Sequence, residues 1–299
     1  MSATCRSLAF LLTAGWLAAA SGIVDEVNAR LERNDFASAA NAIQAYRRAR
    51  GVDPDVLEAM SWMARAELSR KNLAQAEKYA QDTYQLSVAE TKKHTLGKDP
   101  NAPLALALGA AIEVQANVMA LRGERDGAVT YLRGELARFP TASIQPRIQK
   151  NLNLLSLEGK PAPALVGVPL PPGKTALLFF WAHWCPDCKA EAPIIQQLKS
   201  EFAAKGLILI APTQRYGYTA NGDDAPPAVE NRYIEDVRQH FYRGVIEGPL
   251  VIQEQNFRVY GVSTTPTLVL VDRKGIVRMY HPGAMTYPEL RARILAALS

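Results

Sequence analysis

The sequence predicts two parts, an all-helical part followed by an α/β part in which strands and helices form layers. In residues 23–157, apolar positions recur at helix spacing among many alanines. After residue 174, short β-prone apolar runs alternate with helical patterns, which is typical of a layered α/β fold. Between them, residues 158–174 are rich in Pro and Gly and indicate a linker or an extended lead-in segment. We therefore predict one domain at 21–157 and a second at 158–299.

The composition is that of an ordinary globular protein long enough for two domains. The 299 residues are 48% hydrophobic and 21% charged, with a net charge of +5. Lys and Arg residues are scattered among acids and form no basic block, so we expect no nucleic-acid partner.

The first 20 residues resemble an export signal. Leu8–Ala20 is an apolar run too short for a comfortable membrane span, and Ala18–Ala20 fits a small-residue cleavage site. Cleavage there would remove Cys5 and leave only Cys185 and Cys188. We expect an exported protein, periplasmic or otherwise extracytoplasmic. A short buried or membrane-anchoring helix is the alternative, and without cleavage the protein would stay tethered.

A repeated unit organises the helical half. Each copy is a helix end, a tight polar turn and a helix with small residues on its packed face. The copies start at Leu31, Leu68 and Leu121, and the longer second interval contains the 91–103 loop. This pattern resembles degenerate tetratricopeptide repeats, in which stacked helix pairs bury a shared face. A generic helical bundle is the alternative. Either would be a scaffold, with a possible protein partner on the repeats.

The second half gives a definite order of elements. Residues 213–248 exceed what a compact core needs and include a polar loop. We expect strands at Thr175–Trp181, Leu207–Ala211 and Leu250–Ile252, a hairpin of Thr267–Val271 and Ile276–His281, and helices at Cys185–Ala204, Val229–Tyr242 and Tyr287–Leu298.

Cys185 falls where the first strand ends and a helix begins. Unpaired N–H groups and the helix dipole favour a negative charge there, and the thiolate is the nucleophile in disulfide exchange. Cys188 follows one turn later, close enough to form a disulfide with Cys185. We predict a redox dithiol with Cys185 as the exposed nucleophile and Cys188 as the buried thiol that attacks the mixed disulfide.

The second half resembles the thioredoxin superfamily. Trp181–Cys188 matches its active-site stretch, Pro193 its helix-kinking proline, and Tyr260–Leu268 the loop with its cis-proline, here Pro266. Together with the lead-in Gly159–Pro163, these motifs look most like exported TlpA/ResA-type disulfide reductases. The resemblance implies a central mixed sheet flanked by helices and thiol–disulfide oxidoreductase activity. It also implies no cofactor beyond the Cys185–Cys188 disulfide and no metal.

The resemblance also assigns a candidate base. Phe179 stands where the thioredoxin pattern has a buried aspartate, so that proton acceptor is missing. Glu191, one turn after Cys188, matches an acid found in the TlpA/ResA-type branch. A buried thiol benefits from a base, so Glu191 is our candidate. A surface glutamate in a helix salt bridge is the alternative.

Three residues are candidates for substrate binding. A cis peptide before Pro266 would leave the Thr265 backbone free to pair with an extended substrate segment. Trp184 would then cover one side of the dithiol, the alternative being a plain core aromatic.

The dipeptide between the cysteines sets the redox bias. Pro186 and Asp187 lie in the first helical turn, and the Asp187 charge opposes a negative sulfur. A less stable thiolate makes the disulfide a weaker oxidant, so we predict a reductase. Its partners would be protein thiols or disulfides and an electron-donor redox protein.

Two other functions remain open. The helical repeats could carry the function as an interaction scaffold, with the α/β half secondary. Alternatively, Cys185 and Cys188 could handle Cu(I), for which two thiolates are acceptable although they make an incomplete zinc site.

Overall fold

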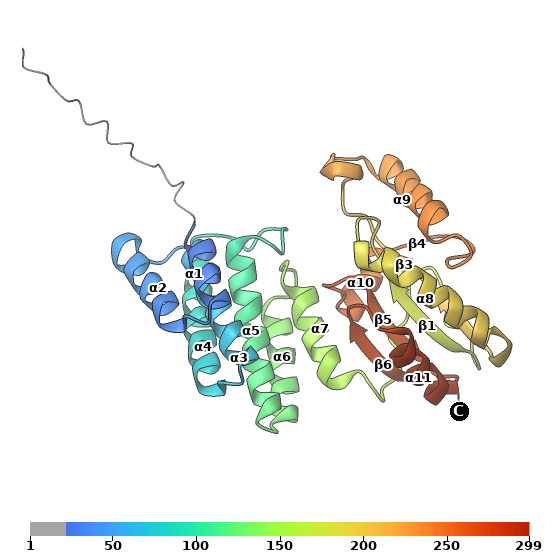
Figure 1. Cartoon of the computed structure of the whole chain (residues 1–299), viewed down its shortest axis with the longest axis horizontal. Helices are drawn as coiled ribbons and strands as arrows, with labels where there is room; N and C mark the ends of the chain where they lie inside the picture. Colours follow the sequence, from blue (N-terminus) through green and yellow to red (C-terminus); the bar gives the residue numbers. More distant parts are fainter. Residues whose placement is uncertain (1–21, 299) are drawn as a thin grey trace, which may run out of the picture.

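The computed structural model describes residues 22–298, apart from the side chain of Asn221. The predicted export signal, its cleavage site and Cys5 lie outside the described residues. Figure 1 shows the two predicted parts side by side, the helical part on the left and the α/β part on the right. Helix α7 stands between them. The predicted fold class, an all-helical part followed by a mixed sheet flanked by helices, is therefore confirmed.

The helical part consists of antiparallel helix pairs and a final helix. Each pair is joined by a tight turn, and α7 leads toward the α/β part. The elements are α1 (Ile23–Glu32), α2 (Phe36–Arg50), α3 (Pro54–Ser69), α4 (Leu73–Glu90), α5 (Pro103–Leu121), α6 (Arg125–Arg138) and α7 (Gln145–Ser156).

The turns within the three pairs have the same geometry. Asn34, Lys71 and Gly123 all have positive φ, at 59°, 62° and 87°. The Gly123 N–H donates to the carbonyl of Ala120, just as the Asn34 N–H donates to that of Leu31. The third copy therefore aligns on Ala120, one residue before the predicted Leu121, which is 61% exposed. Their identification with tetratricopeptide repeats stays a prediction.

Helix α5 forms the centre of the helical part. It packs against α3, α4, α6 and α7. By length and composition it could cross a membrane, but 61% of its apolar 18-residue stretch is buried inside the protein. An apolar surface all round suits a helix with neighbours on every side.

The α/β part is built on a four-stranded mixed sheet. Its order is β2-β1-β5-β6, with β1 parallel to β2 and antiparallel to β5. The strands are β1 (Thr175–Phe180), β2 (Leu207–Ile210), β5 (Thr267–Val271) and β6 (Val277–Pro282).

Helices cover both faces of this sheet. Side chains alternate along a strand, so β1 contributes side chains to a core on each face. Leu177 and Phe179 of β1 pack in one core with helices α8 (Pro186–Phe202) and α11 (Tyr287–Leu298). Leu178 and Phe180 pack in the opposite core with helix α10 (Glu254–Tyr260). This two-sided cover is why β1 is buried along its whole length.

Two elements in this part were not predicted. Helix α10 lies in a segment to which no element was assigned from the sequence, and β3 (Pro212–Thr213) pairs in parallel with β4 (Val251–Ile252). The predicted helix at 229–242 is present as α9 (Pro227–Phe241). Short 3₁₀ turns occupy Ala203–Lys205 and Ala220–Gly222. The other elements match their predicted positions within a few residues.

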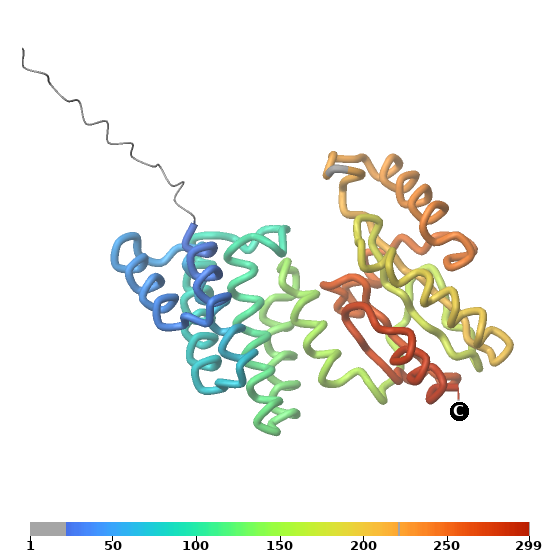
Figure 2. Tube along the Cα trace, in the orientation of Figure 1, coloured from blue at the N-terminus to red at the C-terminus, as the bar shows by residue number. Residues whose placement is uncertain are grey.

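The two parts meet at the level of their backbones. Figure 2 follows the chain from α7 into the sheet, and α7 packs against α10 and β6. The Asn153 side chain of α7 donates to the Tyr260 carbonyl over 2.8 Å in a buried contact. Gly261, which ends α10 with φ 62°, faces α7 so closely that a Cβ there would lie 2.3 Å from the Lys150 backbone nitrogen.

Candidate active site

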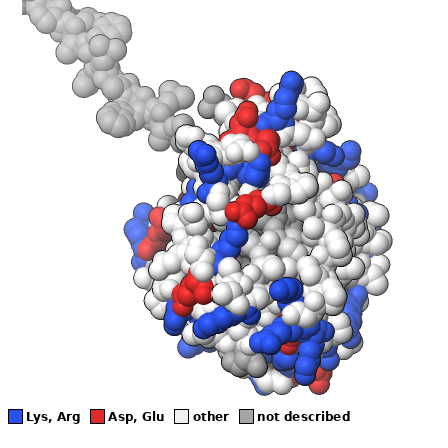
Figure 3. Space-filling model, turned by 90° about the vertical axis from the view of Figure 1, so that its right-hand side faces the viewer, with Lys and Arg blue, Asp and Glu red and all other residues white. Residues whose placement is uncertain are grey.

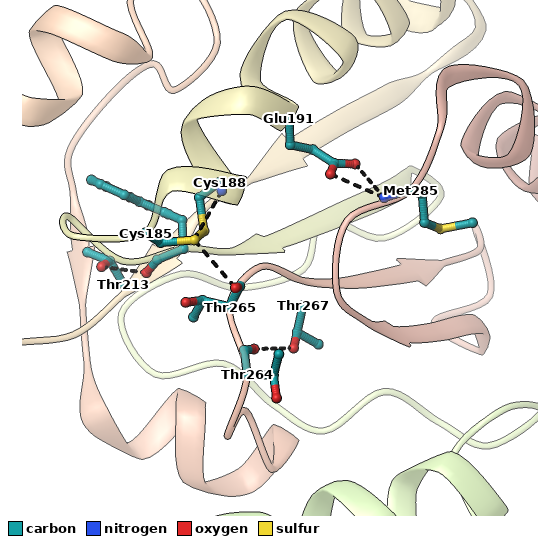
Figure 4. Close-up of a disulfide and its surroundings, with 9 residues drawn as sticks. Cys185, Cys188, Glu191, Thr213, Thr264, Thr265, Thr267 and Met285 are labelled. Atoms are coloured by element: carbon teal, nitrogen blue, oxygen red, sulfur yellow. Dashed lines mark hydrogen bonds between the residues drawn. A yellow bond between two sulfur atoms is a disulfide. The ribbon is translucent and has the colours of Figure 1, made fainter. Parts of the chain in front are cut away.

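Cys185 and Cys188 are joined as a disulfide at the beginning of α8. Cys185 caps this helix in an extended conformation, and its Sγ accepts the N–H of Cys188 over 3.0 Å. The Cα atoms lie 5.3 Å apart, and Figure 4 shows both sulfurs on the same side of the helix end. In the reduced protein, the same N–H group would stabilise a thiolate on Cys185.

The expectation that Cys185 is exposed is wrong for this oxidised form. Cys185 is 1% exposed and Cys188 is fully buried. The Cys185 Sγ lies 3.4 Å from the Thr265 carbonyl oxygen, which covers it. A disulfide sulfur carries no proton, so this is a close contact rather than a hydrogen bond. Any partner must therefore approach the sulfur beside the loop that contains Thr265.

That loop contains the expected cis peptide bond, between Thr265 and Pro266. The Thr267 hydroxyl donates to the Thr264 carbonyl over 2.7 Å, and the Gly283 N–H donates to the Pro266 carbonyl, so both flanks are held. Figure 4 shows Thr265 directed at the disulfide. Its hydroxyl oxygen is buried and has no hydrogen-bond partner among the residues described.

Trp184 lies beside the disulfide on the surface. Its side chain is 44% exposed, so the alternative of a plain core aromatic is wrong. Its ring meets the Tyr216 ring edge to face, with the centroids 5.5 Å apart. Both rings and Thr265 line the same cleft. The arrangement puts an aromatic surface next to the sulfur pair.

Glu191 of α8 is buried and is not a surface residue. It is 2% exposed and makes no ion pair in the described part of the chain, so the alternative of a helix salt bridge is wrong. Burial raises the pKa of Glu191 to about 7, against the opposing effect of the Met285 N–H, which lies 3.2 Å from each carboxylate oxygen. Figure 4 shows the carboxylate directed at Met285, with Cys188 one turn back on the helix. A carboxyl with this pKa can exchange protons near neutral pH.

Phe179 is the residue that the predicted resemblance puts at the position of a buried aspartate. It is fully buried in the core that contains both cysteines. Pro186 and Asp187 are exposed in the first turn of α8. Within residues 22–298, no three His, Cys, Asp or Glu side chains are grouped to hold a metal ion.

A buried histidine beside the disulfide was not assigned a role from the sequence. His183 is 1% exposed, and its Nε2 lies 3.4 Å from a carboxylate oxygen of Glu230 on α9. Burial lowers the pKa of His183, and the charge of Glu230 opposes that shift. Glu230, itself 1% exposed, also accepts the N–H groups of Tyr216 and Gly217.

The rings around His183 complete this arrangement. The rings of Tyr216, Tyr218 and Tyr233 meet it edge to face, with centroids 5.5, 5.3 and 5.3 Å away. The 213–248 segment therefore wraps around the residue that precedes Trp184 and Cys185. From the sequence, only the position of His183 next to the cysteine motif could be recognised. Its contacts with the 213–248 segment could not.

A family model described as a thioredoxin-like domain matches residues 170–298. The thioredoxin-like protein YneN of Bacillus subtilis is 28% identical over 123 residues, which are 41% of this chain and 64% of that protein. The thiol-disulfide oxidoreductase ResA of Halalkalibacterium halodurans is 28% identical over 114 residues, which are 38% of this chain and 57% of that protein. The chain thus spans less than two thirds of the length of these relatives.

Solved structures give similar matches. A putative thiol:disulfide interchange protein DsbE from Chlorobium tepidum aligns with TM-score 0.36 and 27% identity, covering 48% of this chain and 98% of that one. StoA from Bacillus subtilis aligns with TM-score 0.33 and 22% identity, covering 46% of this chain and 98% of that one. The family match, the mixed sheet and the cysteine motif agree with the predicted resemblance, and residues 170–298 of this chain are a thioredoxin-like domain.

Proposed function

We propose that this protein is a thiol–disulfide oxidoreductase that exchanges disulfides with protein substrates through Cys185 and Cys188. The observation that carries the proposal is the disulfide at the beginning of α8, with the Thr265 carbonyl 3.4 Å from its outer sulfur. The name thiol-disulfide oxidoreductase, carried by relatives that match this half, supports it. No cofactor beyond the disulfide is required.

The exchange proceeds in two steps, each a displacement at sulfur. In the reduced protein, the Cys185 thiolate attacks one sulfur of a substrate cystine, whose S–S bond breaks and releases one substrate thiolate. The Cys188 thiol then loses its proton and attacks Cys185. This step breaks the mixed disulfide, releases the second substrate thiolate and forms the Cys185–Cys188 bond. Two electrons pass to the substrate, and an electron-donor redox partner must restore them.

We assign three supporting roles around this reaction. Glu191 accepts the proton of Cys188, because its pKa of about 7 suits transfer near neutral pH. Trp184 and the backbone at Thr265–Pro266 contact the substrate segment that carries the cystine. The exposure of Trp184 and the contact of the Thr265 carbonyl with the Cys185 sulfur support this assignment.

The reaction is proposed to run as a reduction of substrates. Asp187 adds a negative charge to the helix turn that faces the Cys185 thiolate, which disfavours the reduced form. Pro186 fixes the first turn beside it. Together they make the pair a weak oxidant.

Location and partners are part of the proposal. The N-terminal pattern supports export to an extracytoplasmic compartment, where protein cystines occur. The helical part offers a surface for a protein partner. Figure 3 shows Lys and Arg mixed with Asp and Glu over the face of the α/β part, which supports the absence of a nucleic-acid partner.

Trapping of mixed disulfides tests the exchange reaction. Cys188→Ala leaves Cys185 unable to release its partner, so this variant should accumulate covalent adducts that a reductant cleaves. The matched control, Cys185→Ala with Cys188→Ala, should accumulate none. Adducts in neither variant, with no reduction of a model cystine by the native protein, would refute the proposal. Full biological activity of Cys185→Ser would instead favour the scaffold function.

A further inference from the structure

A cleft lies between the helical part and the residues that flank the disulfide, Trp184 and Thr265. Its volume is about 750 Å³. One wall is formed by Trp184, Tyr216 and the 262–265 loop, and the other by residues of α3, α5 and α7. Thr265, whose carbonyl covers the Cys185 sulfur, belongs to the first wall. A segment bound in the cleft would therefore pass beside the reacting sulfur.

The helical wall is positively charged. Arg65 of α3 and Arg147 and Lys150 of α7 line it. Glu113 forms ion pairs with two of them, with its carboxylate 2.6 Å from Arg147 Nε and 3.8 Å from Lys150 Nζ. Asp99 also lines the cleft, and its carboxylate accepts the backbone N–H of Asn101. The lining residues of this wall therefore comprise three cations and Asp99, while the carboxylates of Glu113 and Glu58, which do not line the cleft, act on these cations.

Arg65 is the cation without an acceptor. Its Nε and Nη2 atoms are buried and have no hydrogen-bond partner in the part of the chain that the structure describes. Its guanidinium lies 4.5 Å from the Trp62 ring centroid. Burial lowers the pKa of Arg65 to about 10, and the neighbouring charge of Arg147 acts in the same direction, whereas the charges of Glu113 and Glu58 oppose this shift. A carboxylate that reached Arg65 would gain charge-assisted hydrogen bonds.

The spacing between the two walls is set by backbone packing. Gly261 lies against the α7 backbone next to Lys150, and Asn153 of α7 bonds the Tyr260 carbonyl. The 262–265 loop follows directly from this contact. The cationic wall and the sulfur are therefore held at a fixed separation.

We propose that this cleft binds an acidic segment of the substrate protein, next to the cystine that is reduced. A carboxylate of that segment pairs with Arg65, while the chain runs past Trp184 and Thr265 to the sulfur. The proposal rests on the proposed disulfide exchange and adds the class of substrate. The charge of the helical wall and the position of Thr265 at the sulfur carry it.

Matched peptides test the acidic preference in the full-length reduced protein. Two synthetic peptides carry the same intramolecular cystine, one flanked by Asp and Glu and the other by Asn and Gln. We expect kcat/KM to be about tenfold higher for the acidic peptide, the effect of one charge-assisted hydrogen bond, and to fall with added salt. Equal rates on the two peptides would overturn the acidic preference while leaving disulfide exchange intact. Failure to reduce either peptide would instead refute the proposed function.

Variants locate the preference in the cleft. Arg65→Gln should reduce the ratio of the two rates to about one. The control Arg48→Gln, at an exposed arginine of α2, should keep the full ratio. Thermal melting checks that the variants are folded, and Arg65→Met provides a second variant because it removes a buried charge that has no acceptor. An undiminished ratio in both folded Arg65 variants would overturn the assignment.

Competition separates a polypeptide from a free acid. A cystine-free acidic peptide should inhibit reduction of the acidic substrate, whereas succinate at the same carboxylate concentration should not. Equal inhibition by succinate would show that the cleft binds small carboxylates and would overturn the polypeptide assignment.

Discussion

Replacing Glu191 with glutamine tests both the electrostatics of the buried carboxyl and its proposed proton transfer. Burial raises the pKa of Glu191 from its ordinary value of 4.5 to about 7. The folded protein therefore binds this proton more tightly than the unfolded chain. The stability this confers is fully present below about pH 4.5 and is lost as the pH rises through about 7. A shift of this size corresponds to roughly 3 kcal/mol of unfolding free energy.

Glutamine keeps the acceptor for the Met285 N–H but carries no titratable proton. The oxidised Glu191→Gln variant should therefore lose the part of the pH dependence that falls between about pH 4.5 and 7. Denaturant unfolding across this range measures it. Glu254→Gln, at an exposed position of α10, is the matched control and should leave the profile unchanged. An unchanged profile in Glu191→Gln would contradict the raised pKa.

The same variant tests the role of Glu191 in exchange. The rate at which Cys188 resolves a mixed disulfide should rise in the native protein with an apparent pKa near 7. Glu191→Gln should slow this step by about 10²-fold near neutral pH, the usual effect of losing a general base. Stopped-flow measurement with a preformed mixed disulfide isolates the step. A native rate and pH profile in the variant would refute Glu191 as the base.

Three further changes test other parts of the structure. Glu230→Gln can satisfy only part of the buried hydrogen bonding that Glu230 provides and should lower the unfolding free energy by about 1–3 kcal/mol, measured by chemical denaturation. Gly261→Ala places a Cβ 2.3 Å from the Lys150 nitrogen and should cost clearly more than Gly275→Ala, which has a similar φ and open space around it. Equal costs would contradict the close backbone approach. Asp187→His should raise the reduction potential by on the order of tens of millivolts, measured by equilibration with glutathione. A potential unchanged by that substitution would refute the proposed redox bias.

The parts of the fold that were predictable depend on local signals. Pro54 and Pro103 begin helices α3 and α5, a position that proline favours, and the short apolar runs form β1, β2 and β5. Helix α10 was missed because its seven residues, Glu254–Tyr260, are too few to show a helical period. Its packing against α7 stabilises it instead.

At the site, the sequence predicted contacts between residues close together in the chain, but not contacts between distant segments. The disulfide and the cis peptide bond follow from motifs that are contiguous in the sequence. The burial of Cys185 depends on the Thr265 carbonyl, which comes from a distant loop. The contact between His183 and Glu230 likewise joins the segment between β1 and α8 to helix α9, and no local pattern marks it.

The backbone contact at Gly261 has a consequence for how tightly any ligand of the cleft can bind. When two halves of a molecule swing freely, a ligand that bridges them must first restrict their motion, and this entropic cost weakens binding. Here, the packing of Gly261 against the α7 main chain already restricts the motion of the two parts in the folded protein, so a ligand need not restrict it again. Discrimination then depends on shape as well as charge. We therefore expect an extended polypeptide segment to bind in this cleft in preference to a folded surface.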